Sequence, residues 1–469
     1  MPLNHDAPEW IENRVFDEIQ LGDTASVVRQ LTADDIALFA IISGDVNPAH
    51  LDPEYAATDL FHRIIAHGMW GGGLISAVLG TKLPGPGTIY LSQDLHFHAP
   101  VGIGDTITAS VTVREKNAEK KSLALDCICA NQDGKNVITG TAIVRAPVTH
   151  LRLRRQTLPD VRLQRHERFQ PIIEQARTLS PATVAVAHPC DPVTICAVAE
   201  LMSLGMISPI LVGPAAKIAA AAASAGIDIS TWRLIEAPHS HASAAEAVSL
   251  IRRGEATILM KGSLHTDELM HEVTASATGL RTNRRLSHVY VMDVPSYDRL
   301  LFVTDAAINI APTLEEKADI VRNAIELAHV LGVAMPKVAV LSAVETVNPA
   351  LRSSVEASAL AKMSDRGQIM GGIVDGPLAF DNAVSLEAAA QKGIISPVAG
   401  MADVLVVPDL ETGNMVAKQL SFLAGADAAG VVMGAKVPII LTSRADSQRT
   451  RIASCAVARL MAEREAPAD

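Results

Sequence analysis

Two hydrophobic patterns divide the chain. In its first third, stretches of alternating apolar and β-branched residues run from Thr88 to Ala99, Asp105 to Lys116 and Ser122 to Ala130, with turn signals between them. This alternation is typical of strands with one buried face in an antiparallel sheet. The apolar stretch from Trp70 to Leu83, which contains Gly71-Gly-Gly73, predicts a helix. We therefore predict an antiparallel sheet and a long apolar helix in this third.

Later in the chain, short runs of Val, Ile, Leu and Ala alternate with helical segments. Strands separated by helices of this length form parallel sheets that helices cover on both faces. We therefore predict a three-layer α/β region. The predicted strands are Thr183 to Ala187, Pro209 to Val212, Thr257 to Met260, His288 to Met292, Lys337 to Leu341, Val404 to Val407, Gly430 to Met433 and Pro438 to Leu441.

An arginine-rich strip separates the two patterns. Between Leu151 and Gln170 there are six arginines against two acidic residues, and prolines lie around them. This composition is typical of a solvated linker, and a clamp for CoA phosphates is the alternative interpretation. We predict domains at residues 1–150 and 171–469, joined by a linker at 151–170.

The composition is that of a globular enzyme. The 469 residues are too many for one compact core, so two or three domains are expected. Hydrophobic residues make up 49% of the chain and aromatic residues only 3%, as in α/β enzymes. The net charge of -11 argues against a general nucleic-acid binder and against binding to an anionic membrane surface.

The chain lacks the signals of export. No apolar run reaches transmembrane length without Gly, Pro or a charge, and the first residues lack a signal-peptide layout. We expect a cytoplasmic protein. In a reducing compartment the five cysteines (Cys127, Cys129, Cys190, Cys196 and Cys455) are expected to be buried thiols.

An acid/base pair lies in one tight loop, because Asp45 and His50 are separated by turn-forming residues. Gly44, Asn47 and Pro48 favour a turn, which brings the carboxylate and the imidazole onto one cavity wall. A water held between them is activated when one group takes its proton and the other returns one. The alternative is an ordinary structural turn. The chemistry that fits best is addition of water across an activated double bond.

The sequence after the pair predicts an oxyanion site. Gly68 begins the apolar helix, where backbone N–H groups without helical partners favour a developing enolate oxygen. His67 is interpreted as a packing or hydrogen-bonding residue. His96 and His98 share one face of a predicted strand, but no third ligand for a metal is evident.

The string Ser43-Gly-Asp-x-Asn-Pro-x-His50, with Ala66-His-Gly-Met69, resembles the (R)-specific enoyl-CoA hydratases of the MaoC-like hot-dog family over about residues 12 to 148. The resemblance implies an α+β fold, in which an antiparallel sheet wraps a long helix, and a dimer. It implies Asp45 and His50 as the catalytic pair, Gly68 as the amide donor and Ser76 as a residue that orients the site. Asn47 is a candidate substrate-binding residue.

The α/β half lacks nucleotide fingerprints. It contains no Gly-x-x-x-x-Gly-Lys-Ser/Thr loop and no convincing dinucleotide fingerprint after a strand, so ATP and NAD are not expected. Glycines cluster instead in Met370 to Pro377 and Val432 to Pro438, next to predicted strand ends. We therefore expect a ligand cleft there.

Five sequence motifs in the α/β half resemble the phosphate acetyltransferase and phosphate butyryltransferase family. Their sequences are closer to the butyryl branch. The resemblance covers about residues 183 to 464 and implies two subdomains, at about 171–293 plus 430–469 and 294–429, with a cleft. It implies reversible acyl transfer between CoA and phosphate. The strings are Leu301 to Asn309, Val374 to Asn382, Ser396 to Gly400, Val407 to Asn414 and Leu441 to Ser447.

Acyl transfer of this kind needs a base near the thiol, donors for the oxyanion and a cation for the phosphoryl group. Ser443 and Arg444 match the family's Ser-Arg pair, so we assign the serine to the oxyanion and the guanidinium to phosphate. The family's aspartate base is replaced by Thr450. Asp446 is the candidate base, and an N-cap of the next helix is the alternative role for it.

Further family matches are expected to line the cleft. They are Asp305, Asn309 and Asp375, although buried turn residues would produce the same strings. Arg281 is a candidate for binding phosphate or CoA. No metal and no tightly bound cofactor is expected.

Three hypotheses follow. The first is a fused enzyme with an enoyl-CoA hydratase domain and a phosphate acyltransferase domain, both acting on CoA thioesters. The second makes the hot-dog domain a non-catalytic acyl-CoA sensor or dimerisation module, and the third makes the transferase half silent. The expected partners are acyl-CoA, CoA and phosphate, and a homo-oligomer is expected through the hot-dog domain.

Overall fold

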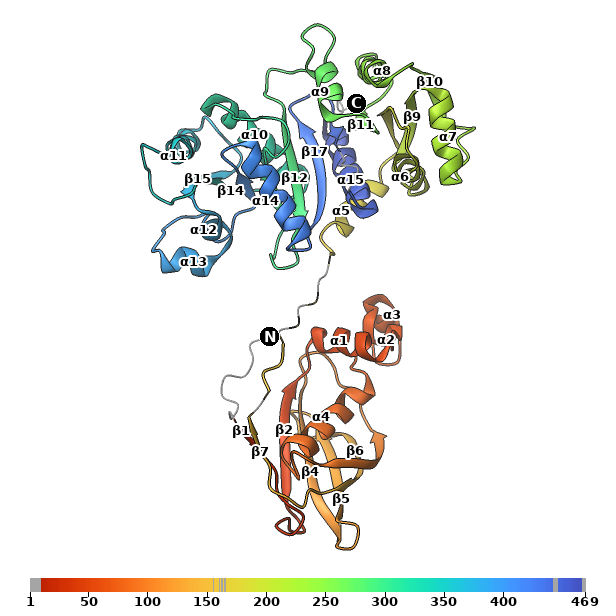
Figure 1. Ribbon diagram of the computed structural model, residues 1–469, viewed down its shortest axis with the longest axis vertical. Helices are drawn as coiled ribbons and strands as arrows, with labels where there is room; N and C mark the ends of the chain where they lie inside the picture. Colours follow the sequence, from red (N-terminus) through yellow and green to blue (C-terminus); the bar gives the residue numbers. More distant parts are fainter. Residues whose placement is uncertain are drawn as a thin grey trace. The chain divides into compact units, whose positions relative to one another are not determined.

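The chain folds into two compact units, Met1–Leu163 and Gln164–Asp469 (Figure 1). The computed structural model describes residues 10–154, 156–159, 161, 163, 166–441 and 446–465. No described helix combines the length and the apolar character that crossing a membrane requires.

The first unit is built on a five-stranded antiparallel sheet of order β2-β4-β5-β6-β3. Its strands are β2 (Thr24–Gln30), β3 (Ile89–Phe97), β4 (Thr106–Asn117), β5 (Ser122–Ala130) and β6 (Asn136–Arg145), with the short pair β1 (Trp10–Glu12) and β7 (Arg152–Arg154). Its helices are α1 (Ala33–Ser43), α2 (Pro48–Leu51), α3 (Pro53–Thr58) and α4 (Gly68–Thr81).

Helix α4 supplies one side of the first unit's core. Gly71, Ile75, Val78 and Leu79 are buried, and their spacing of three and four residues places them on one helix face. This face packs with inward side chains of β4 and β5 such as Val111. Each fully buried aliphatic side chain contributes about 1.5–3 kcal/mol, which offsets the poor helix propensity of the three consecutive glycines.

The predicted strands of this unit are present as β3, β4 and β5, and the predicted helix is α4. The sequence prediction did not include β2 and β6. The edge strand β3 leaves Ile89, Leu91 and Phe97 half exposed. The homo-oligomer expected through this domain stays a prediction.

The second unit contains one sheet of eleven strands, in the order β10-β9-β8-β11-β18-β17-β12-β13-β16-β14-β15. Helices cover both of its faces, as predicted for an α/β region (Figure 1). Its strands are β8 (Ala182–Ala187), β9 (Ile207–Gly213), β10 (Arg233–Glu236), β11 (Ile258–Lys261), β12 (Ser287–Asp293), β13 (Leu301–Thr304), β14 (Lys337–Leu341), β15 (Ile373–Leu378), β16 (Val404–Val406), β17 (Asp427–Met433) and β18 (Ile439–Ile440). Its helices are α5 (Gln170–Arg177), α6 (Pro192–Ser203), α7 (Ala215–Ala225), α8 (Ser240–Arg252), α9 (Thr266–Thr274), α10 (Leu314–Val330), α11 (Arg352–Asp365), α12 (Phe380–Val384), α13 (Leu386–Gln391), α14 (Leu410–Phe422) and α15 (Gln448–Glu465).

The sheet is mixed, which differs from the expected parallel sheets. Strand β12 runs antiparallel to both β13 and β17, and β17 runs antiparallel to β18. The parallel group β10-β9-β8-β11-β18 therefore runs opposite to the parallel group β13-β16-β14-β15. As a result, the two groups have their carboxyl ends at opposite edges of one sheet.

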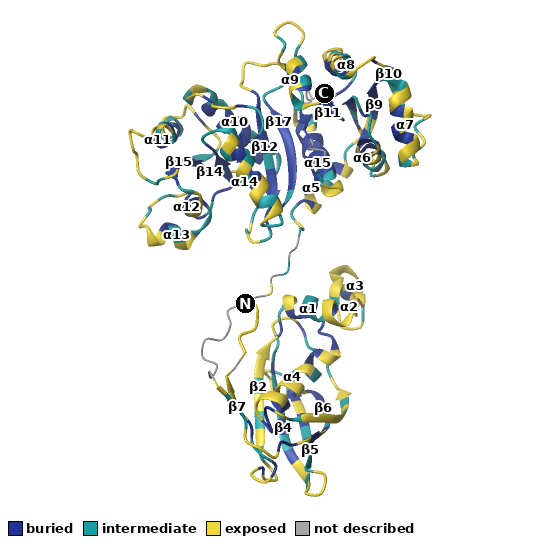
Figure 2. Cartoon of the chain, viewed as in Figure 1, coloured by how far each residue is buried: buried dark blue, intermediate teal, exposed yellow. Residues whose placement is uncertain are grey.

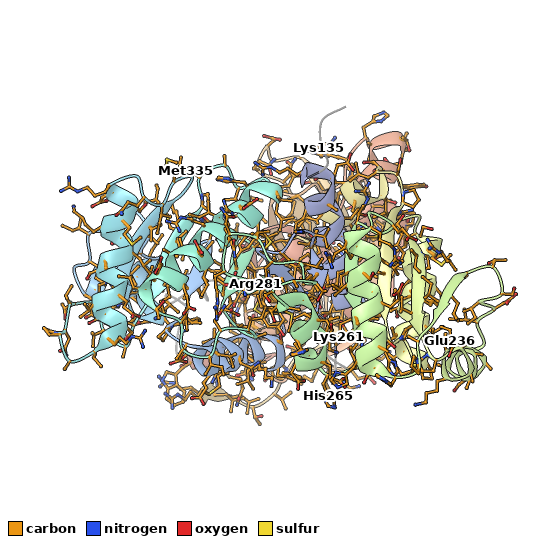
Figure 3. All side chains as sticks on the ribbon, turned by 90° about the horizontal axis from the view of Figure 1, so that it is seen from above. Lys135, Glu236, Lys261, His265, Arg281 and Met335 are labelled. Carbon is orange, nitrogen blue, oxygen red and sulfur yellow. The ribbon has the colours of Figure 1, made fainter. Side chains whose placement is uncertain are left out.

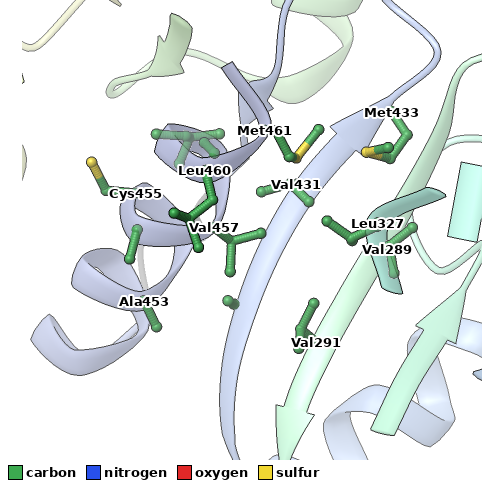
Figure 4. Close-up of a cluster of buried hydrophobic side chains, with 14 of the residues drawn as sticks. Val289, Val291, Leu327, Val431, Met433, Ala453, Cys455, Val457, Leu460 and Met461 are labelled. Atoms are coloured by element: carbon green, nitrogen blue, oxygen red, sulfur yellow. The ribbon is translucent and has the colours of Figure 1, made fainter. Parts of the chain in front are cut away.

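The strands β12 and β17 pass through the buried centre of this unit (Figure 2). Val289 and Val291 of β12 pack with Val431 of β17 against helices α10 and α15, where Leu327 and Val457 lie (Figure 4). Because side chains alternate across a strand, Met292 points to the other face, where it joins a separate cluster. The central strands are thus covered on both sides.

The cysteines follow their prediction only in part. All five are free thiols, and Cys127, Cys129 and Cys455 are buried. Burial raises the pKa of the Cys129 and Cys455 thiols to about 12, so they stay protonated at neutral pH. Cys196 is exposed and Cys190 is half-buried, so the expectation of five buried thiols is wrong for these two. Cys196 lies on the outer face of α6, where a small side chain needs no core position.

We predict opposite effects for two neighbouring glycines of α4. A Cβ at Gly71 would overlap Cδ1 of the buried Ile138, whereas a Cβ at Gly73 meets nothing within 4 Å. Gly71→Ala should therefore lower the free energy of unfolding by about 1–3 kcal/mol, and Gly73→Ala should raise it by about 0.5–1 kcal/mol. Thermal and urea unfolding of the two variants would measure this, and equal effects would contradict the described packing of α4.

Candidate active sites

The loop that carries the predicted acid/base pair joins two helices. Helix α1 ends at Gly44, which adopts a left-handed conformation (φ 75°) that glycine takes without strain. Asn47 caps α2, because its side chain accepts a hydrogen bond from the Ala49 N–H at 3.2 Å, and Pro48 follows at the first helical position. The expected turn is therefore present, and Asn47 uses its carbonyl oxygen within it.

The turn brings Asp45 and His50 together and adds His67. One ligand atom from each of the three side chains lies within 4.8 Å of the others. Asp45 is exposed, His50 is half-buried and His67 is buried. The Asp45 carboxylate also accepts the Asn47 N–H at 3.2 Å, which holds it in the turn.

A cavity of about 280 Å³ opens beside the pair. His50 and His67 form its polar wall, and Gly68 lies at its edge as the first residue of α4. The N–H of a first helical residue has no partner within its helix. The rest of the lining is mostly apolar and includes Phe61, Ala66, Trp70, Phe97, Val101 and Ile138.

Packing favours glycine at position 68. A Cβ there would lie 2.9 Å from Cε1 of Phe97, which also lines the cavity. The helix N-terminus therefore approaches Phe97 most closely as bare backbone. The arrangement places His50 and the N-terminus of α4 around one mostly apolar cavity, with a carboxylate oxygen of Asp45 within 4.8 Å of a ring nitrogen of His50.

The structure places Ser76 elsewhere. This residue is exposed on α4, two turns beyond Gly68, and is not among the residues that line the cavity. Its role in orienting the site stays a prediction. His98 does line the cavity, and its Nε2 lies 2.7 Å from the Thr139 hydroxyl, while His96 lies beside Asp94.

A second cavity, of about 530 Å³, lies between α14 and the start of α15. Asp446 lines it, together with Asp427 at the start of β17 and Lys418 of α14. The predicted residues Ser443 and Arg444 lie outside the described residues. The strand β18 and Leu441 lead directly into this segment.

The residue after Asp446 has the capping role that was the alternative for Asp446. The Ser447 hydroxyl accepts the Thr450 N–H at 3.1 Å and so caps α15. Thr450, which replaces the family's aspartate, is buried in the first turn of α15, and its side chain bonds to Ser447. Asp446 thus remains as the carboxylate of the segment that faces the cavity.

Tyr290 was not predicted from the sequence. Its ring lines the same cavity from β12, and burial together with the charge of Asp446 raises the pKa of Tyr290 to about 12. The phenol therefore stays a hydrogen-bond donor at neutral pH. Alternation along β12 places this residue on the face opposite Val289 and Val291, but only the sheet order brings it beside Asp446.

Lys261 is a second residue that the sequence analysis missed. It ends β11, is buried, and lies 3.3 Å through Nζ from the Gly262 carbonyl (Figure 3). Because Met260 pairs with Ile440, Lys261 lies beside Leu441, where the chain enters the Ser-Arg string. The chain therefore holds a buried lysine at the end of β11, beside Leu441.

Asp305 and Asn309 are buried turn residues. The Asp305 carboxylate accepts the N–H groups of Ala307, Ile308 and Asn309 at 3.0–3.1 Å, and the Asn309 amide bonds to it as well. Burial raises the pKa of Asp305 while these donors oppose the rise. Neither side chain is among those that line the cavity beside Asp446, and the expectation that they line the cleft stays a prediction.

The loop of Asp305 still touches the cavity through α14. Asn414, which lines the cavity, has its Nδ2 3.4 Å from the Ala306 carbonyl, and Gly413 packs so closely that a Cβ would lie 2.4 Å from the Asp305 carbonyl. The strings that contain Asp305 and Asn414 therefore contact each other and help to hold α14 in position.

Two predicted residues lie away from Asp446. Asp375 is half-buried on the edge strand β15, where its carboxylate accepts the Gly376 N–H. Arg281 is exposed beside a third cavity of about 570 Å³, before β12 (Figure 3). Among the described residues no acidic side chain pairs with Arg281, whereas Arg285 pairs with Glu316. The guanidinium of Arg281 is thus available to bind an anion. Asp375 lies on an edge strand and does not line this cavity.

Comparisons with known proteins divide the chain in the same way. A family model described as phosphate acetyl/butaryl transferase matches residues 241–459, and one described as MaoC like domain matches residues 20–126. A phosphate acetyltransferase of Rhizobium meliloti is 61% identical over 297 residues, which are 63% of this chain and 94% of the relative.

Two solved structures are similar to different parts of the chain. A branched-chain phosphotransacylase from Enterococcus faecalis V583 is 34% identical with a TM-score of 0.53, and the match covers 60% of this chain and 99% of that one. An R-hydratase from Pseudomonas aeruginosa is 42% identical with a TM-score of 0.32, and the match covers 33% of this chain and 99% of that one.

His288 of β12, the strand that carries Tyr290, should make the stability of the second unit depend on pH. Its ring is fully buried against Tyr290, with ring centroids 4.4 Å apart, and burial lowers the pKa of His288 to about 3. The unfolded chain, with a histidine pKa near 6.5, binds more protons between these values. The stability from neutral His288 is therefore complete above pH 6.5 and is lost as the pH falls, by about 1.4 kcal/mol per unit.

We expect His288→Gln to reduce the loss of stability between pH 7 and pH 5.5 by about 1.4 kcal/mol, because glutamine does not titrate. Urea unfolding at the two pH values, followed through Trp232 of the second unit, measures the difference. His271→Gln, at an exposed position of α9, is the control. An unchanged acid dependence in His288→Gln would show that this ring does not govern it.

Proposed function

Because the chain belongs to the phosphate acetyl/butyryl transferase family and its first unit carries a MaoC-like domain, we propose that it is a bifunctional enzyme acting on CoA thioesters. Both resemblances and the predicted fold class, a hot-dog domain followed by an α/β domain, are confirmed. The proposed reactions are hydration of a trans-2-enoyl-CoA to an (R)-3-hydroxyacyl-CoA and transfer of an acyl group between CoA and phosphate.

The observation that carries the hydratase proposal is that His50 and Gly68 line one cavity and that a carboxylate oxygen of Asp45 lies within 4.8 Å of a ring nitrogen of His50. A carbonyl oxygen only accepts hydrogen bonds, so the Ile65 carbonyl, 2.9 Å from Nδ1 of His50, keeps the proton on Nδ1. Nε2 is then free to accept a proton. A pure binding module has no need of this arrangement.

In the proposed hydration, the oxygen of water bonds to C3 of the enoyl group while the Asp45–His50 pair takes its proton. The electrons of the double bond move toward the thioester oxygen, where the Gly68 N–H stabilises the developing charge. The pair then returns a proton to C2. One water is added, and the side chains regain their starting protonation.

In the proposed transfer, a phosphate oxygen attacks the thioester carbonyl, a C–O bond forms, and the C–S bond breaks with release of the CoA thiolate. Ser443 is proposed to stabilise the oxyanion, and Arg444 and Lys261 to bind the phosphoryl group. Asp446 is the proposed base for the CoA thiol in the reverse direction, because it faces the cavity and Ser447 supplies the cap. Neither proposed reaction uses a metal or a tightly bound cofactor.

The hydratase proposal is tested with the intact chain and crotonyl-CoA, through the loss of enoyl absorbance. Asp45→Asn should abolish hydration. Gly68→Pro should lower kcat by about 10²–10³-fold, because proline fits the first helical position but lacks the N–H donor.

Gly68→Ala is the matched control for the proline variant. It meets Phe97 in the same way but keeps the N–H, so it should retain much more activity than Gly68→Pro. Absence of hydration in the native chain, with full transferase activity, would instead make the hot-dog domain a binding or dimerisation module. Equal activity of the proline and alanine variants would remove Gly68 from the mechanism.

The transferase proposal is tested by CoA-dependent formation of acyl phosphate from acetyl-CoA and butyryl-CoA. Lys261→Met should raise the KM for phosphate and lower kcat/KM by about tenfold or more, because a charge-assisted bond contributes roughly 1.5–3 kcal/mol. Lys261→Arg, which keeps the charge, is the control. Ser443→Ala should lower kcat sharply, and unchanged turnover in that variant would refute the assignment. Dialysis against a chelator should leave both activities intact.

A further inference from the structure

His67 is a buried titratable group beside the first cavity to which the proposed hydration assigns no step. Its side chain is 2% exposed, and its residue immediately precedes Gly68 in the chain. It lines the cavity together with His50. As the residue before α4 it occupies the N-cap position, yet its side chain makes no capping hydrogen bond. The ring is therefore used for something other than the helix terminus.

The ring of His67 contacts both members of the acid/base pair. Its Nε2 lies 3.0 Å from the backbone carbonyl of Asp45, and its ring centroid lies 4.0 Å from that of His50 at an interplanar angle of 38°. Because a carbonyl only accepts, Nε2 of His67 carries the proton and donates it to Asp45. One side chain thus ties the loop of Asp45 to the face of the His50 ring.

Packing alone does not explain a histidine at this position. Nδ1 of His67 is buried and has no hydrogen-bond partner among the described residues. A buried acceptor without a partner costs free energy that an apolar side chain of similar size would avoid. The ring also packs on Phe39 of α1, at 4.9 Å between centroids, which an apolar residue would do equally well.

We propose that His67 is the positioning residue of the hydratase pair. This inference rests on the proposed hydratase function. The hydrogen bond from Nε2 sets the Asp45 backbone, and the stacked ring sets the plane of His50, relative to the Gly68 N–H. His67 and Gly68 are consecutive residues at the start of α4. The same rigid helix terminus therefore positions both the acid/base pair and the oxyanion donor.

The test compares two substitutions at position 67 in the intact chain. His67→Leu keeps most of the volume and removes the donor. His67→Gln restores a donor, because the glutamine Nε2 reaches about as far as the histidine Nε2. Steady-state hydration of crotonyl-CoA gives kcat and KM for each variant, and transferase activity of the same chain reports the amount of intact protein.

We expect His67→Leu to lower kcat by about 10–100-fold with little change in KM, as is usual when a residue that orients a catalytic group is lost. His67→Gln should recover most of the native kcat. Phe39→Leu is the matched control, because it alters the other contact of the ring and leaves the Asp45 hydrogen bond in place. Its kcat should stay close to the native value.

Two results would overturn the proposal. One is a native kcat in His67→Leu, and the other is equal impairment of His67→Leu and His67→Gln together with a matching fall in the melting temperature of the domain, which would indicate a packing role. A native chain that does not hydrate crotonyl-CoA would refute the hydratase function itself. That outcome is distinct, because it appears before any substitution is made.

Discussion

The second unit depends on the antiparallel pairing of β12 with the strands on both of its sides. β12 pairs with β17 over seven residues and with β13 over four, and it is the link between two groups of parallel strands. Its alternation sends Val289 and Val291 into the core with α10 and α15, and Tyr290 toward the cavity of Asp446. The same backbone hydrogen bonds therefore build the core and aim a phenol at the proposed transferase site.

The change of strand direction at β12 also explains why Asp305 and Asp446 lie in different places. Thr304 and Ile440 lie at the same level of the sheet, since both are opposite Val289, the second through Val431. Their strands run in opposite directions, so the chain after β13 and the chain after β18 leave toward opposite edges. Asp305 therefore enters a buried turn, whereas Asp446 reaches the cavity.

Much of the fold was predictable because buried strands have a recognisable pattern of apolar residues in neighbouring positions. The stretch Ser122 to Ala130 coincides with β5, and the apolar runs of the α/β half match eight of its strands. The strand β15 was missed because Gly376 and Pro377 interrupt its pattern, and β10 because charged residues flank its two apolar ones. The strand β13 was missed although three of its four residues are apolar. Strand direction was not predictable, because an apolar run reads the same in parallel and antiparallel pairing.

In the candidate sites, too, the sequence predicts what depends on neighbouring residues and misses what depends on strand order. Asp45 and His50 were predictable because one local turn brings them together, and Gly68 because a helix start has a sequence signal. Lys261 and Tyr290 were missed, because the position of Lys261 beside Leu441 and that of Tyr290 at the cavity of Asp446 depend on strand order. His67 reads in sequence as a core histidine, and only its hydrogen bond to Asp45 indicates more.

The close approach of α4 to Phe97 has a consequence for recognising related domains. A Cβ at position 68 would press on Phe97, so packing favours glycine there whether or not its N–H takes part in a reaction. A relative that has lost catalysis would keep this preference as long as it keeps the aromatic ring opposite. The glycine is thus a marker of shared architecture, and only the side chains that face it across the cavity distinguish a working enzyme from an inactive descendant.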